Sequence, residues 1–465
     1  MSSTQTRPAS SNIDALLDQI RNIAKQGDAD PGPNVEAPVR RPIEECAEFI
    51  PAAPKSLYQA GVSDSFVEEL ICKFLLARGE TSGRDISDQI KLPFAIVEEV
   101  VGRLKKEQIL SYVGQSTMND YICKLSEMGR ERALRFTRIC TYYGSAPVPL
   151  RDYLHAVKLQ SLEKQHPCED DLRHAFSDLL INKAMFTRLG PAVNSGKGMF
   201  LYGYAGNGKT SIAERITAAF GKYIWIPRSL LLDSDVVRLY DPMVHVDAPI
   251  ESKKGLLASQ EIDNRWVRIL RPTIVVGGEL TMEHLEINFN HITGISEAPV
   301  QLKSNCGTLV IDDFGRQRIS VTELLNRWIV PLEKRFDFLR TSNGKKIQLP
   351  FDQLVIFSTN LEPKDLVDDA FLRRIPYKIE VPNPTREEFT ELFGIIAGKM
   401  GFEFHKDMID TLIERHYVPN SRPFRNCHPR DLLLQIKNYC LYMKLPMELT
   451  NEGFDFACQN YFSIV

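Results

Sequence analysis

The sequence predicts an α/β protein built around a parallel sheet, with a smaller α+β domain before it and a helical region after it. Two observations predict the sheet. A short apolar strand at Met199–Tyr202 leads into a glycine-rich loop and a helix, and a second apolar run ends in two aspartates, Asp312 and Asp313. Fully apolar strands are typical of the centre of a parallel sheet, and ligands bind at the carboxyl edge of such sheets. We therefore expect the functional site at that edge.

Composition excludes several classes of protein. The 465 residues carry 57 basic and 60 acidic side chains, a net charge of −3, which argues against a protein that coats nucleic acid. No apolar run reaches the roughly 18–20 residues that a membrane helix needs, and the amino terminus lacks the apolar core of a secretory signal. The nine cysteines include no Cys-x-x-Cys pair, which disfavours a disulfide framework or a zinc site. We expect a soluble cytoplasmic protein with reduced thiols and no membrane contact.

The chain divides into about three globular units and a tail, at the ordinary size of about 150 residues per domain. Residues 1–54 hold seven of the 27 prolines and are predicted to be disordered. Within them, apolar residues at helical spacing over 13–23 indicate either a fraying helix or a helix that docks on a partner. After a small domain at 55–137 we expect a connector at 138–170, an α/β core at 171–395 and a helical lid at 396–465.

The small domain resembles a winged helix. Its pattern predicts helices over 64–78, 83–90 and 94–107, and then a hairpin over 109–125. However, residues 55–137 contain 12 basic and 12 acidic side chains, and the would-be recognition helix carries Glu98 and Glu99. A helix that reads duplex DNA normally presents cations to the phosphates. Nucleic-acid binding is therefore disfavoured, and we expect a protein-contact or packing role.

The glycine-rich loop is the strongest motif. It reads Gly203-x-x-x-x-Gly208-Lys209-Thr210, between a strand and a helix, which is the context of a phosphate-binding loop. In such a loop, backbone N–H groups face the phosphates and the positive end of the helix favours the anion. We expect Lys209 to bridge the β- and γ-phosphates and Thr210 to ligate Mg²⁺. The predicted nucleotide-binding positions are Gly203, Gly206, Asn207, Gly208, Lys209, Thr210 and Ser211.

The paired aspartates follow the strand 308–311. We expect Asp312 to complete the Mg²⁺ shell with Thr210, and Asp313 to polarise the attacking water. The alternative is a carboxylate pair that caps the next helix. Because the sequence contains no Asn-Lys-x-Asp motif of guanine-specific proteins, we expect the nucleotide to be ATP.

From about residue 170 onward, the order of these motifs resembles the AAA+ ATPases. FDQLVIFSTNL resembles the strand that ends in the sensor-1 residue, which implies that Asn360 lies near the γ-phosphate and the water. DDAFLRRIPYKIEV resembles the segment that carries the arginine finger, so Arg373 and Arg374 are both candidates for a residue that enters a neighbouring subunit's site. HPRDLL resembles the start of the sensor-2 helix, with Arg430 as the lid contact. The resemblance implies a homo-oligomeric ring.

Two further segments resemble hairpins of MoxR-like and related remodelling ATPases. One is predicted around Asn343-Gly344, before the sensor-1 strand, and the other within 271–289, before the paired aspartates. In relatives such hairpins line the pore of the ring or face the substrate. The alternative is that they extend the sheet.

One residue departs from the family. The second carboxylate is usually Glu, whereas Asp313 is one methylene shorter, and small misplacements can slow a reaction about a hundredfold. Hydrolysis is thus expected to be slow, or to use a second group that relays the water. The leading hypothesis is a ring-forming, ATP-hydrolysing protein that remodels or regulates a protein partner. The alternatives are a nucleotide-gated binding switch or adaptor with little turnover, and a DNA-associated AAA+ motor.

Overall fold

The structure, a computed structural model, describes residues 49–116, 120–250 and 262–463. The apolar pattern at 13–23 lies outside the described residues, as does most of the tail predicted to be disordered. Residues 49–54 of that tail are described, and their backbone contacts residues 262 and 263. Ala52 forms a β-bridge with Ile262, and the Asp263 N–H donates to the Pro51 carbonyl at 2.9 Å. No helix within the described ranges is both long enough and apolar enough to cross a bilayer.

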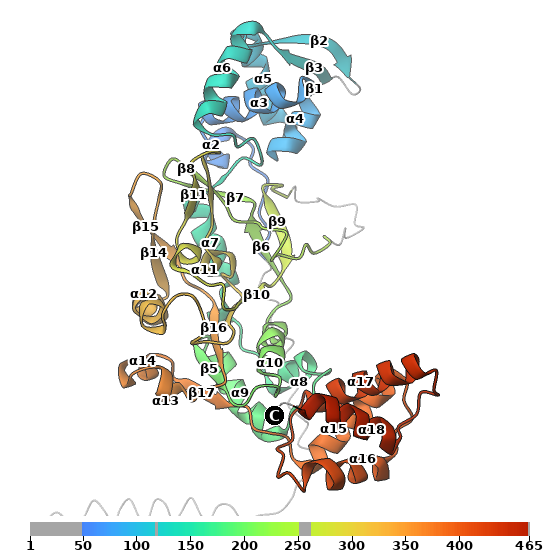
Figure 1. Ribbon diagram of the computed structural model, residues 1–465. Helices are drawn as coiled ribbons and strands as arrows, with labels where there is room; N and C mark the ends of the chain where they lie inside the picture. The colour runs from blue at the N-terminus through green and yellow to red at the C-terminus, as the bar shows by residue number, and fades with distance from the viewer. Residues whose placement is uncertain (1–48, 117–119, 251–261, 464–465) are drawn as a thin grey trace, which may run out of the picture. The chain divides into compact units, whose positions relative to one another are not determined.

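Five parallel strands form the central sheet, which confirms the predicted α/β class (Figure 1). In spatial order they are β10 (Thr273–Val276), β13 (Thr308–Ile311), β16 (Leu354–Thr359), β5 (Met199–Tyr202) and β17 (Tyr377–Glu380). This order differs from the sequence order and puts β16 between β13 and β5. The carboxyl ends of these three strands are therefore neighbours at one edge of the sheet, although about 100 residues separate β5 from β13 in the chain.

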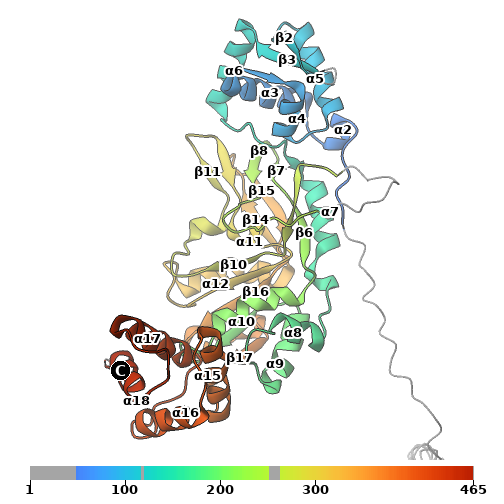
Figure 2. The same cartoon turned by 90° about the vertical axis from the view of Figure 1, so that its right-hand side faces the viewer.

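Helices cover both faces of this sheet (Figure 2). Because strand residues alternate in direction, Met199 and Leu201 pack in one apolar cluster and Phe200 packs in the other. The first cluster includes side chains of α8, α9 and α10, and the second includes side chains of α12 and α14. These helices and the short α13 are α8 (Glu169–Ala175), α9 (Lys183–Asn194), α10 (Lys209–Ile216), α12 (Val321–Lys334), α13 (Pro363–Leu366) and α14 (Asp369–Arg374).

A second β region, inserted between elements of the core, was not expected from the sequence. Its sheet has the order β11-β12-β8-β7-β4, and β6 pairs with β9. The strands are β4 (Val148–Pro149), β6 (Tyr223–Pro227), β7 (Ser229–Leu232), β8 (Asp235–Arg238), β9 (Trp266–Leu270), β11 (Asn288–Asn290) and β12 (Ile295–Glu297). Helices α7 (Leu150–Gln160) and α11 (Val300–Lys303) pack in the same core. Strand β4 and helix α7 thus give structure to the predicted connector.

The prediction of a hairpin within 271–289 is wrong. Its first half is β10, which pairs in parallel with β13 and belongs to the central sheet. The antiparallel partner of β11 is β12, which follows it in the chain. The apolar run 273–276 could not be assigned from its sequence alone, because a short buried strand looks the same in a hairpin and in a parallel sheet.

The hairpin before β16 is present, formed by β14 (Phe336–Arg340) and β15 (Lys346–Pro350) around the expected Asn-Gly turn. Its tip is bonded to the turn between β7 and β8. Ser342 donates to the Asp235 carboxylate through its N–H (2.7 Å) and its hydroxyl (2.8 Å). Asn343 and Lys345 both donate to Asp233, at 3.0 and 2.7 Å. The hairpin neither extends the central sheet nor has a free tip.

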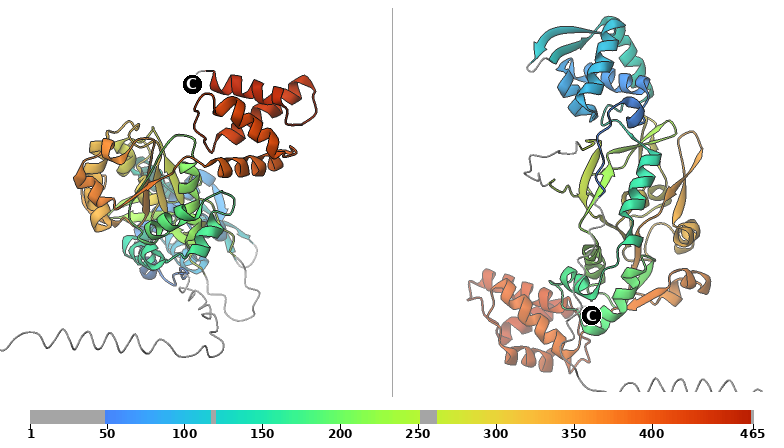
Figure 3. Two further views of the ribbon diagram at one scale, coloured as in Figure 1. Left: turned by 90° about the horizontal axis from the view of Figure 1, so that it is seen from below. Right: turned by 180° about the vertical axis from the view of Figure 1, so that it is seen from behind.

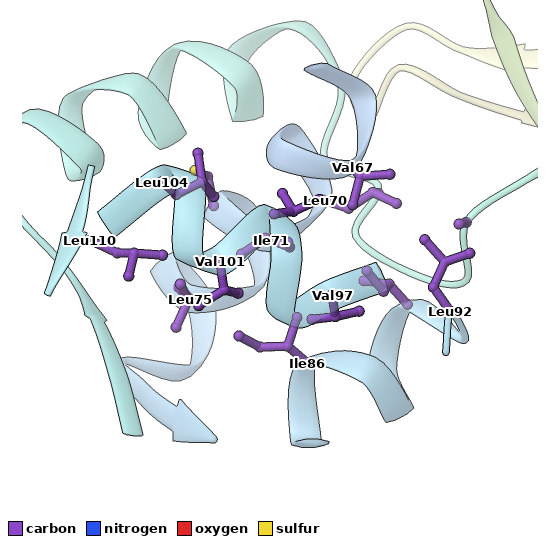
Figure 4. Close-up of a cluster of buried hydrophobic side chains, with 14 of the residues drawn as sticks. Val67, Leu70, Ile71, Leu75, Ile86, Leu92, Val97, Val101, Leu104 and Leu110 are labelled. Carbon is purple, nitrogen blue, oxygen red and sulfur yellow. The ribbon is translucent and has the colours of Figure 1, made fainter. Parts of the chain in front are cut away.

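The domain at 55–137 contains the predicted helices and hairpin around one apolar core (Figure 4). Leu70, Ile71, Val97 and Leu104 are fully buried in that core. An additional strand, β1, pairs with β3. The elements are α2 (Leu57–Ala60), α3 (Asp64–Arg78), β1 (Glu80–Ser82), α4 (Gly83–Ile90), α5 (Phe94–Lys106), β2 (Leu110–Ser116), β3 (Asp120–Leu125) and α6 (Glu127–Ile139).

The lid is helical (Figure 3). Its four helices pack around an apolar cluster of their own. They are α15 (Arg386–Met400), α16 (Lys406–Leu412), α17 (His428–Met443) and α18 (Asn451–Phe462), with a π-helical turn at Ile413–Tyr417. A capping box formed by Thr385 and Glu388 begins α15, whose Phe389 and Phe393 are fully buried in the lid cluster. The predicted boundary at 396 therefore falls inside a lid helix, and the lid begins at about residue 385.

Candidate nucleotide site

The loop between β5 and α10 has the backbone conformation that its glycines allow. Gly203, Gly206 and Gly208 have φ of 134°, 84° and 84°, values that other residues rarely adopt. A Cβ at residue 203 would lie 2.5 Å from the Val381 carbonyl oxygen, and one at residue 206 would lie 2.5 Å from Cys427 Sγ. A Cβ at residue 208 would meet no atom within 4 Å. Two of the three glycines thus permit close packing against other parts of the chain.

Lys209 begins α10 and is mostly buried. Its Nζ donates to the carbonyls of Gly203 (2.9 Å) and Tyr204 (3.0 Å) and to Asn360 Oδ1 (2.6 Å). Burial lowers the pKa of this lysine from its ordinary value. The ammonium group is therefore held inside the loop beside the carboxyl end of β16.

Thr210 and Asp312 lie next to each other, as predicted. Thr210 Oγ1 donates to Asp312 Oδ2 at 2.9 Å. Adjacent ligands of an octahedral Mg²⁺, each at about 2.0–2.1 Å from the metal, are themselves about 2.9 Å apart. The hydroxyl and the carboxylate oxygen therefore already have the spacing that two ligands of one Mg²⁺ require.

Asp313 and Asn360 face each other beside this pair. Asp313 has a left-handed backbone (φ 49°), and its Oδ1 is 3.4 Å from Asn360 Nδ2. Gln317 holds the local turn, since its Nε2 donates to the carbonyls of Asp312 (2.8 Å) and Asp313 (3.2 Å) and its Oε1 accepts from the Gly315 N–H (2.8 Å). An unusual backbone conformation fixed by side-chain bonds is common where geometry serves a function.

A cavity of about 690 Å³ joins these residues, within the range of small-molecule sites. Its polar end is lined by Gly206–Ser211, both aspartates and Asn360. The rest of the cavity is lined by apolar side chains together with some charged and polar ones, and sequence reasoning missed this part because its segments carry no motif. The apolar lining comes from the segment before α9, from the start of α9 and from α15, with Leu179, Leu180, Ile181, Met185, Ile395 and Ile396. The same segments also contribute Asp178, Asn182, Glu388 and Lys399. A cavity that joins a glycine-rich loop to a group of apolar side chains fits a nucleotide's phosphates and base.

The lid contacts the phosphate loop through residues that were not predicted. Arg425 Nη1 donates to the Ala205 carbonyl (3.0 Å), Asn426 Nδ2 to the Asn207 carbonyl (3.1 Å), and the Cys427 N–H to the Gly206 carbonyl (2.8 Å). Three successive lid residues thus bond three successive loop carbonyls. A sequence pattern could not reveal these backbone contacts across some 220 residues.

Two predicted binding residues have partners within the protein. Arg430 lines the cavity, but its side chain is 67% exposed and pairs with the adjacent Asp431 at 3.0 Å. Asn207 is buried, and its amide donates to the Pro382 carbonyl (3.2 Å) and to Asn383 Oδ1 (2.8 Å). The Asn207 side chain therefore ties the loop to the segment that leads into the lid.

The structure separates the two arginine-finger candidates, both on α14 and neither lining the cavity. Arg374 Nε lies 2.6 Å from Glu333 Oε1, and its Nη1 donates to the Ala370 carbonyl at 3.0 Å. Arg373 has no side-chain partner within the part of the chain that the structure describes. Of the two, Arg373 is therefore the one whose guanidinium is free to meet another molecule.

The chain has low similarity to known proteins. A domain of unknown function (DUF8689) matches residues 385–460, the region of the lid, and no curated protein matches the chain. A mutant form of RuvB from Thermotoga maritima has 12% identity and a TM-score of 0.34, over 66% of this chain and 74% of that one. NtrX from Brucella abortus has 14% identity and a TM-score of 0.38, over 61% and 56%. The α/β fold is established by the five-stranded parallel sheet described above.

Proposed function

We propose that this chain is an AAA+ ATPase that binds ATP with Mg²⁺ in the cavity and hydrolyses it. The observation that carries the proposal is the Thr210–Asp312 contact, at the spacing of two Mg²⁺ ligands and directly beside Lys209. The apolar side chains in the cavity lining support a nucleotide rather than a bare phosphate as the ligand. The motif order in the sequence supports the family.

Each residue has a role that its position supports. The buried ammonium of Lys209 would hold the β- and γ-phosphates, while Thr210 and Asp312 would hold Mg²⁺. The bound ion supplies positive charge to the phosphate oxygens. Asp313 would orient and polarise the attacking water. Asn360, which is bonded to both Asp313 and Lys209, would help to fix the position of that water.

We propose further that the chain acts as a homo-oligomeric ring in which Arg373 completes a neighbouring subunit's site. Arg374 pairs with Glu333, whereas Arg373 has no side-chain partner among the described residues, and this favours residue 373 for the role. Such a guanidinium stabilises the charge of the transition state. Nucleotide state would reach the lid through Arg430 and through the bonds of residues 425–427 to the loop, and so act on a protein partner.

The test is Lys209→Ala, compared with Lys197→Ala as a control. Lys197 precedes β5, is exposed, and does not line the cavity. We expect Lys209→Ala to abolish ATP binding or steady-state phosphate release, and Lys197→Ala to leave both unchanged. Hydrolysis by Lys209→Ala at the rate of the unaltered chain would contradict the proposed site.

A nucleotide-gated switch with little turnover is the second candidate, favoured by Asp313. The Asp313 side chain is one methylene shorter than that of Glu. Its contact with Asn360, at 3.4 Å, is long for a hydrogen bond. Multi-turnover phosphate release distinguishes the candidates, since a switch would bind ATP and release less than one phosphate per chain. A DNA-associated motor has less support, because Glu98 and Glu99 are exposed on α5.

A further inference from the structure

The loop between β13 and α12 is held in a fixed conformation at the phosphate end of the cavity. The Arg316 N–H donates to the Asp313 carbonyl at 2.9 Å, and Gln317 bonds the backbone on both sides of this turn. The Arg318 N–H donates to the Gly278 carbonyl at 3.1 Å, which attaches the loop to the segment after β10. The backbone at residue 316 is therefore positioned before any ligand arrives.

Arg316 differs from the other cations near the phosphate end. It lines the cavity together with Asp312 and Asp313, and it is exposed. Lys209 is bonded to carbonyl oxygens and an amide oxygen, and Arg430 is paired with Asp431. Across 49–116, 120–250 and 262–463, Arg316 has no side-chain hydrogen bond, ion pair or ring contact.

The charge of the cavity gives this guanidinium a role. Two carboxylates lie at the end where a triphosphate would add several more negative charges, and the bound Mg²⁺ and Lys209 would offset only part of them. An unpaired guanidinium presents up to five N–H donors in a planar fork that suits phosphate oxygens. Because Arg316 follows Asp313 by three residues on a fixed turn and lines the same cavity, its side chain starts close to the two aspartates.

We propose that Arg316 binds the γ-phosphate of the nucleotide held by its own chain, and thereby makes the site prefer ATP over ADP. This inference rests on the proposed function. Arg316 acts within its own chain, whereas Arg373 acts on a neighbouring one. Since ADP lacks the γ-phosphate, the Arg316 contact exists only with ATP, and its charge also stabilises the transferred phosphoryl group.

The experiment compares the affinities for ATP and ADP of the full chain and of Arg316→Gln, each with Mg²⁺. Removing one charged hydrogen-bonding group typically weakens binding about tenfold to a hundredfold. We expect Arg316→Gln to weaken ATP binding by that factor and to leave ADP binding nearly unchanged. Arg316→Lys keeps the positive charge but not the planar group of donors. Its affinity for ATP should lie between those of the unaltered chain and of Arg316→Gln. Arg318→Gln is the matched control, because Arg318 is exposed on the same loop but does not line the cavity.

The outcomes separate this inference from the proposed function. An unchanged ATP-to-ADP affinity ratio in Arg316→Gln, with ATP still bound by the unaltered chain, overturns the role of Arg316 alone. Failure of the unaltered chain to bind ATP overturns the proposed function and this inference with it. Mixing Arg316→Gln with Lys209→Ala chains should restore no hydrolysis, because both defects lie in the site of their own chain. Recovery in that mixture would show that Arg316 acts between chains, and would overturn the proposal.

Discussion

Because Gly206 packs closely against Cys427, we expect that a methyl group added at residue 206 pushes the lid away from the phosphate loop. Gly206 has φ of 84°, and a Cβ there would lie 2.5 Å from Cys427 Sγ. A non-glycine residue in this conformation costs about 1–2 kcal/mol, and forcing an extra carbon into a filled space costs about 1–3 kcal/mol more. Gly206→Ala should therefore weaken docking of the lid by about 2–5 kcal/mol, a factor of about 30 to several thousand.

Hydrogen exchange at the amide of Cys427 measures this effect, because that N–H donates to the Gly206 carbonyl at 2.8 Å in the docked lid. Gly206→Ala should accelerate its exchange strongly without any nucleotide. In a Cys427→Ala background the sulfur is gone, so only the backbone cost of about 1–2 kcal/mol should remain. The two substitutions should thus be non-additive.

Gly208→Ala is the matched control. Its φ is also 84°, but a Cβ there meets nothing within 4 Å, so Gly208→Ala should accelerate the exchange of the Cys427 amide by no more than the backbone cost of about 1–2 kcal/mol. Equal acceleration by Gly206→Ala with and without the Cys427 sulfur would refute the steric argument. No acceleration in either background would refute the docking of the lid on the loop.

Three further predictions concern the arginine pair and one buried histidine. Arg374→Ala removes a partly exposed ion pair and should cost about 1 kcal/mol, measured as a lower melting temperature. Arg373→Ala should lose about a hundredfold or more in hydrolysis and regain activity when mixed with Lys209→Ala chains; no recovery at any ratio counts against a shared site. Burial lowers the pKa of His428, beside Tyr417, from 6.5 to about 4. Between pH 6.5 and about 4 the unfolded chain therefore binds this proton more tightly than the folded chain, and stability should fall by up to about 3 kcal/mol toward pH 4. Urea midpoints at about pH 7 and pH 5 should show this loss, and His428→Gln should reduce it.

The candidate-site residues that the sequence predicted lie within short motifs. A strand, a glycine-rich loop and a helix fix the positions of Lys209 and Thr210 locally, and an apolar strand fixes those of the aspartates. The proximity of Asp312 to Thr210 followed because the parallel strands of one sheet end at the same edge. Periodicity likewise located α3 with its observed bounds, Asp64–Arg78.

The remaining parts depend on long-range packing that no local pattern records. The strands of the second β region have two to five residues each, and several pair with strands distant in sequence. The run 273–276 was assigned to a hairpin because its length and composition fit either arrangement. Arg425 reaches a backbone carbonyl, which any residue type at position 205 would present. Such contacts are set by the fold and have no signature in sequence spacing.

The β14–β15 hairpin is attached at both ends, to strand β16 at its base and to the β7–β8 hairpin at its tip. Only three residues separate β15 from β16, the strand that leads to Asn360. At its other end the same hairpin is fastened to Asp233 and Asp235 by four hydrogen bonds. The hairpin therefore links the strand that leads to Asn360 with the β7–β8 hairpin of the second β region. Asp233→Ala and Asp235→Ala would remove the bonds at the tip, whereas Leu339 and Leu349 would still hold the hairpin in the apolar core of the second β region.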